Sequence, residues 1–361
     1  MSNNNNPSKV YFTPLTMNSS LSERQESLSK ILASFDFSNI IKFKDKVAVK
    51  THVGDVNNTT HIAPEMIRIA VDKIKELKAK PFLTETSTLY AGPRSDAIGH
   101  INLAYEHGFT PKVTGAPFIM ADGLFGNAEI EVEIPGILFN KVNIARDIVL
   151  ADSMIMFSHP TGHILTGIGA AIKNLGMGLS SRKGKLQQHS SIKPYVNKSE
   201  CTFCGECLKW CPVNAIIEID SKAFIQNEIC IGCGECLSIC NFNAIKFNWG
   251  VQSDDIQCRI AEYALGVMQS KKGRSLFINV LTDMTKECDC MSIKQTPIIG
   301  DIGILASTDP VAIDQATLDL TKQENSRTIS EISYPALDAN TQLEHAEKIG
   351  LGNREYNLIQ L

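Results

Sequence analysis

Eight of the eleven cysteines in this chain lie in one short stretch and repeat a single spacing. Each copy reads Cys-x2-Cys-x2-Cys-x3-Cys, and the segments 201–216 and 230–245 are identical at ten of sixteen positions. This spacing brings three thiolates to three corners of an iron–sulfur cubane, while the fourth cysteine reaches the cluster of the other copy. The stretch therefore predicts a module that binds two [4Fe-4S] clusters.

The exchange of the fourth cysteine defines two predicted ligand sets. The first is Cys201, Cys204, Cys207 and Cys240, and the second is Cys230, Cys233, Cys236 and Cys211. Structural zinc is the alternative, but zinc sites usually pair well-separated Cys-x2-Cys knuckles and do not pack four cysteines into eleven residues twice. Thiolate-held clusters also require a reducing compartment, which argues against disulfides.

The length of 361 residues exceeds the usual size of one domain and predicts a large domain plus the small module. The net charge of -4 and the lack of a long basic run argue against a nucleic-acid partner. The polar N-terminus lacks the apolar core of a signal peptide, and no window approaches 18 apolar residues, so no membrane partner is expected. We expect a cytoplasmic protein.

The sequence outside the module alternates strand-like and helix-like segments. Residues 46–51 and 81–86 are short apolar runs, and residues 64–78 and 94–107 have helical patterns, as do 20–35 and 254–268. This alternation predicts an α/β fold with a mostly parallel sheet and flanking helices. We expect a polar leader over 1–20, the α/β domain over 21–193 and 249–361, and an inserted module over 194–248.

Polar residues follow the predicted strands, where ligands of parallel α/β sheets collect. His52 and Asp55 follow the first strand, and Asp122 lies at the strand end within the segment 117–123, before an alternating strand at 129–134. His61, Glu85 and Thr86 occupy similar positions. The alternative is that such residues form turns and helix caps.

Residues 151–189 are the most informative part outside the module. His159 and His163 follow the apolar run 153–157, and Pro160 and Gly162 between them place both histidines on a loop at the strand end. They are candidates for substrate or metal binding. A glycine-rich segment with Lys173 and Asn174 follows, near a predicted helix start that could cradle an anion.

Neither a Walker loop nor the GxGxxG dinucleotide fingerprint is present in that glycine-rich segment. Close packing of a helix on the sheet is the alternative explanation of its glycines. The nearby Arg182, Lys183 and Lys185 add positive charge, with a solvated charge run as the alternative. We expect an anionic substrate or cofactor here.

Strand-like segments return at 276–283 and 297–307, and two features there carry chemistry. Cys288 and Cys290 cannot belong to the two predicted clusters, so they are a candidate third metal site or a reactive thiol pair, with buried inert thiols as the alternative. Asp309 precedes Pro310 and fits a helix N-cap, which is compatible with a second role in binding. Cys258 is expected in a helix core.

The doubled cysteine motif resembles bacterial two-cluster ferredoxins in all eight ligands, with Asn241 where the first copy has Pro212. Together with SHPTGH, KNLGMG, RKGK, CDC and DIGILASTDPVAID, it makes residues 47–319 resemble the uncharacterised iron–sulfur centre proteins of domain-of-unknown-function family 362. The resemblance implies an α/β domain with a ferredoxin insert and implies little about a reaction.

Our first functional hypothesis is an oxidoreductase whose clusters relay single electrons to a site in the α/β domain. The candidate catalytic residues are His159, His163 and Lys173. The candidate substrate- or anion-binding residues are His52, Asp122, Asn174, Arg182, Lys185 and Asp309, with Asp301 as a support. A redox partner protein or a small-molecule donor would supply electrons, and a flavin stays open although no flavin fingerprint appears.

Two other hypotheses come from different classes. One is an electron-carrier or cluster-assembly accessory protein that docks on a partner enzyme. The other makes the clusters structural staples of a ligand-binding protein. A docking scaffold has no need of two histidines and a lysine at a strand end, so that segment favours the enzyme hypothesis.

Overall fold

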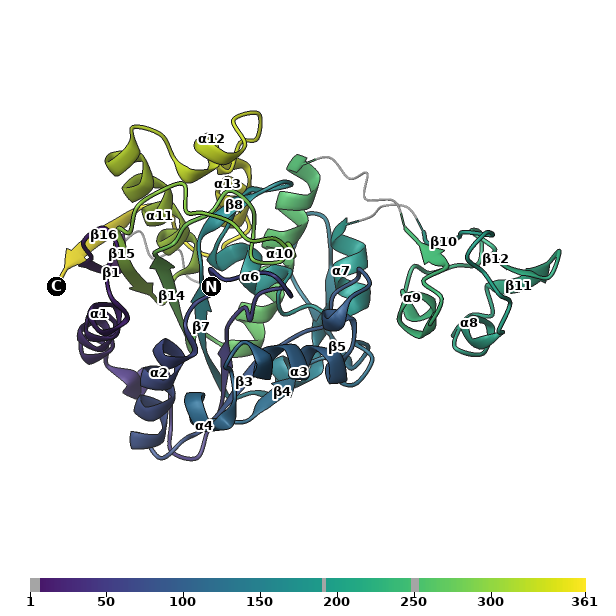
Figure 1. Cartoon of the computed structure of the whole chain (residues 1–361), viewed down its shortest axis with the longest axis horizontal. Coiled ribbons are helices and arrows are strands. Elements are labelled where there is room, and N and C mark those ends of the chain that lie inside the picture. Colours follow the sequence, from purple (N-terminus) through teal and green to yellow (C-terminus); the bar gives the residue numbers. More distant parts are fainter. Residues whose placement is uncertain (1–6, 190–192, 248–252) are drawn as a thin grey trace.

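The structure, a computed structural model, describes residues 7–189, 193–247 and 253–361 of the chain. Five of the seven neighbouring strand pairs in its eight-stranded sheet are parallel, so the predicted α/β class with a mostly parallel sheet is confirmed (Figure 1). The spatial order is β16 (Tyr356–Gln360), β1 (Ser8–Pro14), β15 (Gly303–Ser307), β14 (Ser275–Leu281), β7 (Ser153–Ser158), β2 (Lys46–Lys50), β3 (Lys80–Glu85) and β4 (Phe118–Met120).

The central strands are apolar along their length because helices cover both faces of the sheet. Every residue of β7 is buried, and its side chains alternate between two cores. Met154 and Met156 belong to one core, and Ile155 and Phe157 belong to the other. The sheet therefore separates two hydrophobic layers.

Helices on either side of the sheet supply these two layers (Figure 1). One layer contains α1 (Leu21–Ala33), α2 (Pro64–Glu76), α3 (Ala97–Glu106) and the 3-10 turn η1 (Phe37–Asn39), with α4 (Pro111–Thr114) packed on α2. The other contains α5 (Arg146–Leu150), α6 (Ala171–Gly176), α10 (Ser253–Lys271), α11 (Pro310–Asn325), α12 (Ile329–Ser333) and α13 (Asn340–Lys348). No helix among the described residues combines the length and apolar character needed to cross a membrane.

Several predicted elements differ in detail from the observed ones. The helix predicted at 94–107 is split into the 3-10 turn η2 (Pro93–Ser95) and α3, because Asp96 caps α3 with its side chain. The alternating segment at 129–134 is β5 (Glu129–Glu133), which pairs with β6 (Lys141–Ala145) outside the large sheet. The segment 297–307 contains only β15.

The prediction of a polar leader over residues 1–20 is wrong from residue 8 onward, while residues 1–6 lie outside the described part. Ser8–Pro14 is β1, which lies between β15 and β16 in the large sheet. Ser20 then forms a capping box with Glu23 at the start of α1. The strand is hard to recognise locally because its partners are about three hundred residues away in sequence and supply its apolar contacts.

The elements between residues 195 and 246 form a small unit with its own core, which includes Cys201, Cys207 and Cys236. They are β10 (Tyr195–Val196), α8 (Glu206–Lys209), β11 (Ile216–Ile219), β12 (Lys222–Ile225), α9 (Glu235–Ile239) and β13 (Ile245–Lys246). Because β10 pairs with β13, the chain enters and leaves this unit at neighbouring points.

Among the described residues, side chains of the small unit contact the large domain at several points. Glu235 accepts a hydrogen bond from the Asn127 amide at 2.9 Å, and the rings of Phe125 and Trp210 meet edge to face. A small apolar cluster of Leu89, Leu186, Leu237 and Phe247 completes the contact.

Candidate functional site

A cavity of about 510 Å³ lies at the carboxyl ends of β2, β3 and β7 and extends to the segment after β14. This is the edge of a parallel sheet where ligands usually bind. Its wall unites sequence-predicted residues from four separate segments: His52, Asp55, Glu85, Thr86, His159, His163, Lys173, Asn174, Lys185, Cys288 and Cys290.

The buried carboxylate of Glu85 lies at one wall of the cavity and contacts several charged or polar side chains. Glu85 pairs with the Lys50 ammonium at 2.7 Å and contacts the His100 ring at 3.0 Å. Burial acts to raise the pKa of Glu85, but the charges of Lys50 and Arg94 and the hydrogen bond with His100 outweigh it and hold that pKa well below its ordinary value. Glu85 therefore stays ionised inside the protein.

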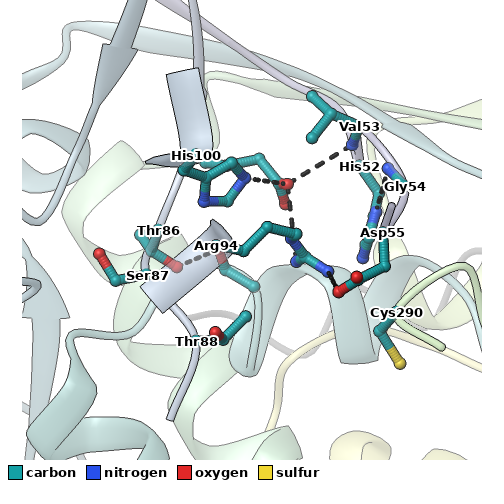
Figure 2. A network of polar contacts seen from close by, with 12 residues as sticks. His52, Val53, Gly54, Asp55, Thr86, Ser87, Thr88, Arg94, His100 and Cys290 are labelled. Atoms are coloured by element: carbon teal, nitrogen blue, oxygen red, sulfur yellow. Dashed lines mark hydrogen bonds and ion pairs between the residues drawn. The ribbon is translucent and has the colours of Figure 1, made fainter. Parts of the chain in front are cut away.

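Arg94 is a cavity residue that the sequence reasoning missed. Its guanidinium lies 3.5 Å from the Asp55 carboxylate and 3.2 Å from the Tyr90 hydroxyl. Figure 2 shows the Arg94 side chain between Asp55 and His100. Tyr90 in turn donates a hydrogen bond to the carbonyl of Cys290 at 3.2 Å. In the sequence Arg94 is the first residue of the predicted helix 94–107, a position that carries no signal of a role in a cavity.

Cys288 and Cys290 lie together at the cavity wall. The Lys173 ammonium lies 3.2 Å from the Cys288 sulfur, and the backbone N–H of Cys290 donates to the same sulfur at 3.4 Å. A hydrogen bond from the Cys290 thiol lowers the pKa of Cys288 to about 5 against the effect of burial, and Lys173 assists. The pKa of Cys290 is raised well above its ordinary value because its thiol proton is shared with Cys288. The pair therefore holds one thiolate and one thiol.

His159 is a structural partner of this thiol pair. One ring nitrogen lies 2.8 Å from the Asp289 carboxylate, and the other lies 2.8 Å from the Thr282 carbonyl. Because both neighbours are acceptors, the ring serves both only as an imidazolium. Burial alone would lower the pKa of His159, but Asp289 raises it. His159 therefore holds Asp289 and has no ring nitrogen left for a substrate.

His52, which is partly buried, and His163, which is buried, are neutral histidines. Burial, followed by the charge of Arg94, holds the pKa of His52 well below its ordinary value. For His163, burial and then Lys173 lower the pKa in the same way. In each ring Nδ1 accepts a backbone N–H, from Gly54 in His52 and from Thr166 in His163. Each ring therefore carries its proton on Nε2 and is a hydrogen-bond donor.

The hairpin that carries His163 differs from the predicted loop. His163 ends β8 (Thr161–His163), which pairs with β9 (Gly167–Gly169). Pro160 lies between β7 and β8, so it interrupts no hydrogen-bonded ladder. Of the two histidines predicted on a loop, His159 therefore lies between β7 and β8, and His163 lies within the short antiparallel hairpin of β8 and β9.

The predicted anion cradle at the glycine-rich segment is filled by the protein itself. The backbone N–H groups of Ala171 and Ile172 at the start of α6 both donate to the Asp314 carboxylate at 2.8 Å. Asn174 donates to the Phe157 carbonyl and so ties α6 to β7. Of the predicted cradle, the Lys173 and Asn174 side chains line the cavity, whereas the N–H groups at the start of α6 are already bonded to Asp314.

Lys185 provides a second buried cation. Its ammonium donates to the Thr86 hydroxyl at 2.5 Å and to the Ser180 carbonyl at 2.7 Å, from α7 (Arg182–His189). Burial lowers the pKa of Lys185 to about 7. Burial likewise raises the pKa of the nearby Asp122 to about 6, and Asp122 accepts a hydrogen bond from the Ser87 N–H. Asp122 does not line the cavity, but it fixes the backbone at Ser87 and its charge acts on Lys185.

Four other predicted residues lie away from the cavity. Asp309 caps α11 through the N–H groups of Val311 and Ala312, so the expected capping role is confirmed, whereas the structure does not bring Asp309 to the site. Asp301 pairs with Arg24 at 2.9 Å. His61 stacks on His107, and Arg182 donates to the Ser95 carbonyl.

A second hollow of about 690 Å³ lies between the small unit and the large domain. Leu89, Tyr90 and Ala91 line this hollow and also line the first cavity. Cys240 and Leu237 of the small unit form part of its opposite wall, and Arg182 also lines it. The loop Leu89–Ala91 therefore borders both the thiol-containing cavity and the hollow next to the cysteine-rich unit.

The eight clustered cysteines form no disulfide bonds and influence one another's pKa values. Burial raises the pKa of Cys207 to about 11, with further contributions from Cys240, Cys204 and Cys201. Burial also raises the pKa of Cys233, with contributions that include Cys211 and Cys230. Cys240 is thus a neighbour of Cys207, and Cys211 is a neighbour of Cys233. Among the described residues, no three His, Cys, Asp or Glu side chains form a site for a single metal ion.

Comparisons with known proteins give distant structural likenesses and one family. The lactate racemase apoprotein from Thermoanaerobacterium thermosaccharolyticum is 13% identical, with a TM-score of 0.39, over 76% of this chain and 51% of that one. A protein from Thermotoga maritima is 11% identical, with a TM-score of 0.38, over 88% and 59%. The chain thus spans little more than half of either structure, and a search of curated proteins finds no match. The family model for Domain of unknown function (DUF362) matches residues 47–319, so the chain belongs to this family.

Proposed function

We propose that this protein is an iron–sulfur oxidoreductase that uses single electrons in the cavity at the strand ends. The observation that carries the proposal is the doubled cysteine motif beside a hollow that shares the loop Leu89–Ala91 with the thiol-containing cavity. A [4Fe-4S] cluster bound to each cysteine set would exchange one electron at a time.

The donor set suits such clusters. We assign Cys201, Cys204, Cys207 and Cys240 to one cluster and Cys230, Cys233, Cys236 and Cys211 to the other. Backbone N–H groups donate to the sulfurs of Cys211 at 3.2 Å and Cys240 at 3.3 Å. Such contacts stabilise negative charge on cluster ligands and tune reduction potentials.

The cavity residues suit an anionic substrate. Lys50 and Arg94 are matched by Glu85 and Asp55, whereas the contacts described for Lys185 are to a hydroxyl and a carbonyl oxygen. Lys173 faces the Cys288 thiolate. An anionic group of the substrate would pair with Lys185, while His52 and His163 would donate hydrogen bonds from Nε2.

Anaerobic purification with iron and sulfide analysis tests the proposal, together with electron paramagnetic resonance before and after dithionite. We expect about eight iron and eight sulfide per chain and signals from two reducible clusters. The Cys204→Ser variant should lose one signal, and Cys258→Ser, whose cysteine lies on α10 outside both sets, should keep both. Zinc in place of iron, or iron that dithionite does not reduce, would contradict the proposal.

A further inference from the structure

The turn that carries the Cys288–Cys290 pair is held on several sides. The Met291 N–H donates to the Cys288 carbonyl at 2.9 Å and closes the turn. The central residue, Asp289, accepts hydrogen bonds from His159, from the Asn58 amide at 2.9 Å and from the Thr60 hydroxyl at 3.0 Å. Buried networks of this kind fix a backbone segment in one position. The two thiols are therefore presented to the cavity on a rigid support.

The Lys173 ammonium lies 3.2 Å from the Cys288 sulfur at the cavity wall. Gly169 lies beside this lysine, and a Cβ placed on Gly169 would make only an ordinary contact with the Lys173 side chain, at 3.5 Å. The result is a thiolate with a cation on one side and a thiol on the other, which is the environment of a nucleophilic cysteine.

The same environment disfavours a metal ion at this pair. A divalent cation bound to Cys288 would lie close to the Lys173 ammonium, and like charges in a buried site repel strongly. The carboxylate between the two cysteines is also engaged, since the Asp289 oxygens already accept hydrogen bonds from His159 and Asn58. Of the two predicted alternatives, these contacts favour the reactive thiol pair.

We propose that Cys288 and Cys290 form a redox-active dithiol that reduces a disulfide bond in an anionic substrate. The inference rests on the proposed function for its electrons. It adds the identity of the reacting atoms and the class of the substrate bond.

The exchange balances in two displacement steps. The Cys288 thiolate attacks one sulfur of the substrate disulfide, the substrate bond breaks, and the departing thiolate takes the proton of Cys290. The Cys290 thiolate then attacks the Cys288 sulfur and releases the second substrate thiolate, which takes a proton from Lys173. The products are two substrate thiols and a disulfide between Cys288 and Cys290.

Two electrons and one proton return that disulfide to one thiolate and one thiol, and a proton from solvent restores the Lys173 ammonium. The electrons come from a low-potential one-electron donor by way of the proposed clusters. A dithiol is a two-electron couple, whereas an iron–sulfur cluster carries one electron. A pair of clusters beside a single dithiol therefore matches the electron count of one turnover.

Redox titration of the intact protein with thiol–disulfide buffers tests the couple directly. Trypsin releases both cysteines on the peptide from Glu287 to Lys294, because Lys286 precedes it and Lys294 ends it. We expect this peptide to lose the mass of two hydrogen atoms on oxidation and to regain it with dithiothreitol. The inference would be overturned if the peptide never loses this mass, or if the protein retains one metal ion for each Cys288–Cys290 pair.

Trapping experiments identify the nucleophile. With dithiobis(nitrobenzoate) as an anionic disulfide, Cys290→Ser should accumulate a mixed disulfide on Cys288, and Cys288→Ser should not. Lys173→Met should slow the reaction about tenfold at about pH 6, because the thiolate loses its cation. Lys183→Met is the matched control, since Lys183 pairs with Glu129 outside the cavity. Equal rates for both lysine variants would contradict the role of Lys173.

A last comparison separates this inference from the proposed function. The oxidised pair is treated with dithionite in the native protein and in Cys204→Ser. Slower reduction of the pair in Cys204→Ser supports both ideas. Equal rates, with the disulfide still reversible in dithiothreitol, would leave the dithiol couple standing and contradict the supply of electrons through the clusters.

Discussion

At the residue scale, Lys50 and Glu85 show how two opposite charges are stabilised together inside the cavity wall. Both side chains are almost completely buried, at 0% and 3% exposure. Burial lowers the pKa of Lys50, and Glu85 partly restores it. Each ion is tolerated only because the other is present, since an unpaired buried charge is costly. The pair sits directly under the strand ends that carry the site.

Lys50→Met should therefore destabilise the protein strongly. We expect a loss of about 3 kcal/mol in the free energy of unfolding, because the Glu85 carboxylate stays buried with weaker partners. The matched control is Arg68→Met, whose exposed pair with Asp72 within α2 should contribute about 0.5 kcal/mol or less. Denaturant unfolding followed by circular dichroism measures both, and similar losses for the two variants would refute the argument.

Close helix packing positions the site at the element scale. The short helix α6 carries Lys173 and packs against α10 at Gly176. A Cβ on Gly176 would lie 2.1 Å from the Ile260 carbonyl oxygen, which no side chain can tolerate without movement. The glycine-rich segment that suggested an anion cradle is therefore explained in part by packing, and this packing sets how far Lys173 extends toward Cys288.

Gly176→Ala should cost about 1 to 3 kcal/mol of stability, because α6 must move away from α10. Gly169→Ala is the control, since its added Cβ would have its nearest neighbour, the Thr161 hydroxyl, at an ordinary 3.4 Å. Midpoints of denaturant unfolding compare the two variants. Equal midpoints would mean that α6 and α10 are not packed as closely as the structure has them.

The whole molecule combines a large sheet with a small unit that has a separate core. The two cores of the sheet include no residue from 194 to 248, as far as the described residues extend. The pairing of β10 with β13 also brings the ends of the unit together. Asn127, Phe125 and Leu186 of the large domain contact the unit from outside these two cores. The α/β domain should therefore not depend on the unit for folding.

A chain in which a short Gly-Ser linker replaces residues 194–248 should stay folded and bind no iron. The full chain stripped of its metal is the control, and both should show the same near-ultraviolet circular dichroism apart from the contribution of Tyr195, Trp210 and the other aromatic residues removed. If the shortened chain is insoluble while the metal-stripped full chain stays soluble, the unit is required for the fold of the sheet.

Predictions from sequence were reliable where the signal is local. The runs before His52 and His159 are apolar because those strands are buried on both faces, and so their carboxyl ends could be located. Asp309 was recognisable as a cap because the residue after it is a proline. β1 was missed and Arg94 was overlooked, because the residues that give each its role lie far away in sequence.

The sequence by itself determined the spacing of the eight clustered cysteines, the α/β class and the candidates at the strand ends, because all three depend on short-range periodicity. Only the tertiary structure decided which candidates share a cavity. In it, His159 pairs with Asp289, the N–H groups at the start of α6 donate to Asp314, and Lys173 lies against Cys288. The partner of a buried polar group is chosen by packing between distant segments, and local sequence carries no record of that choice.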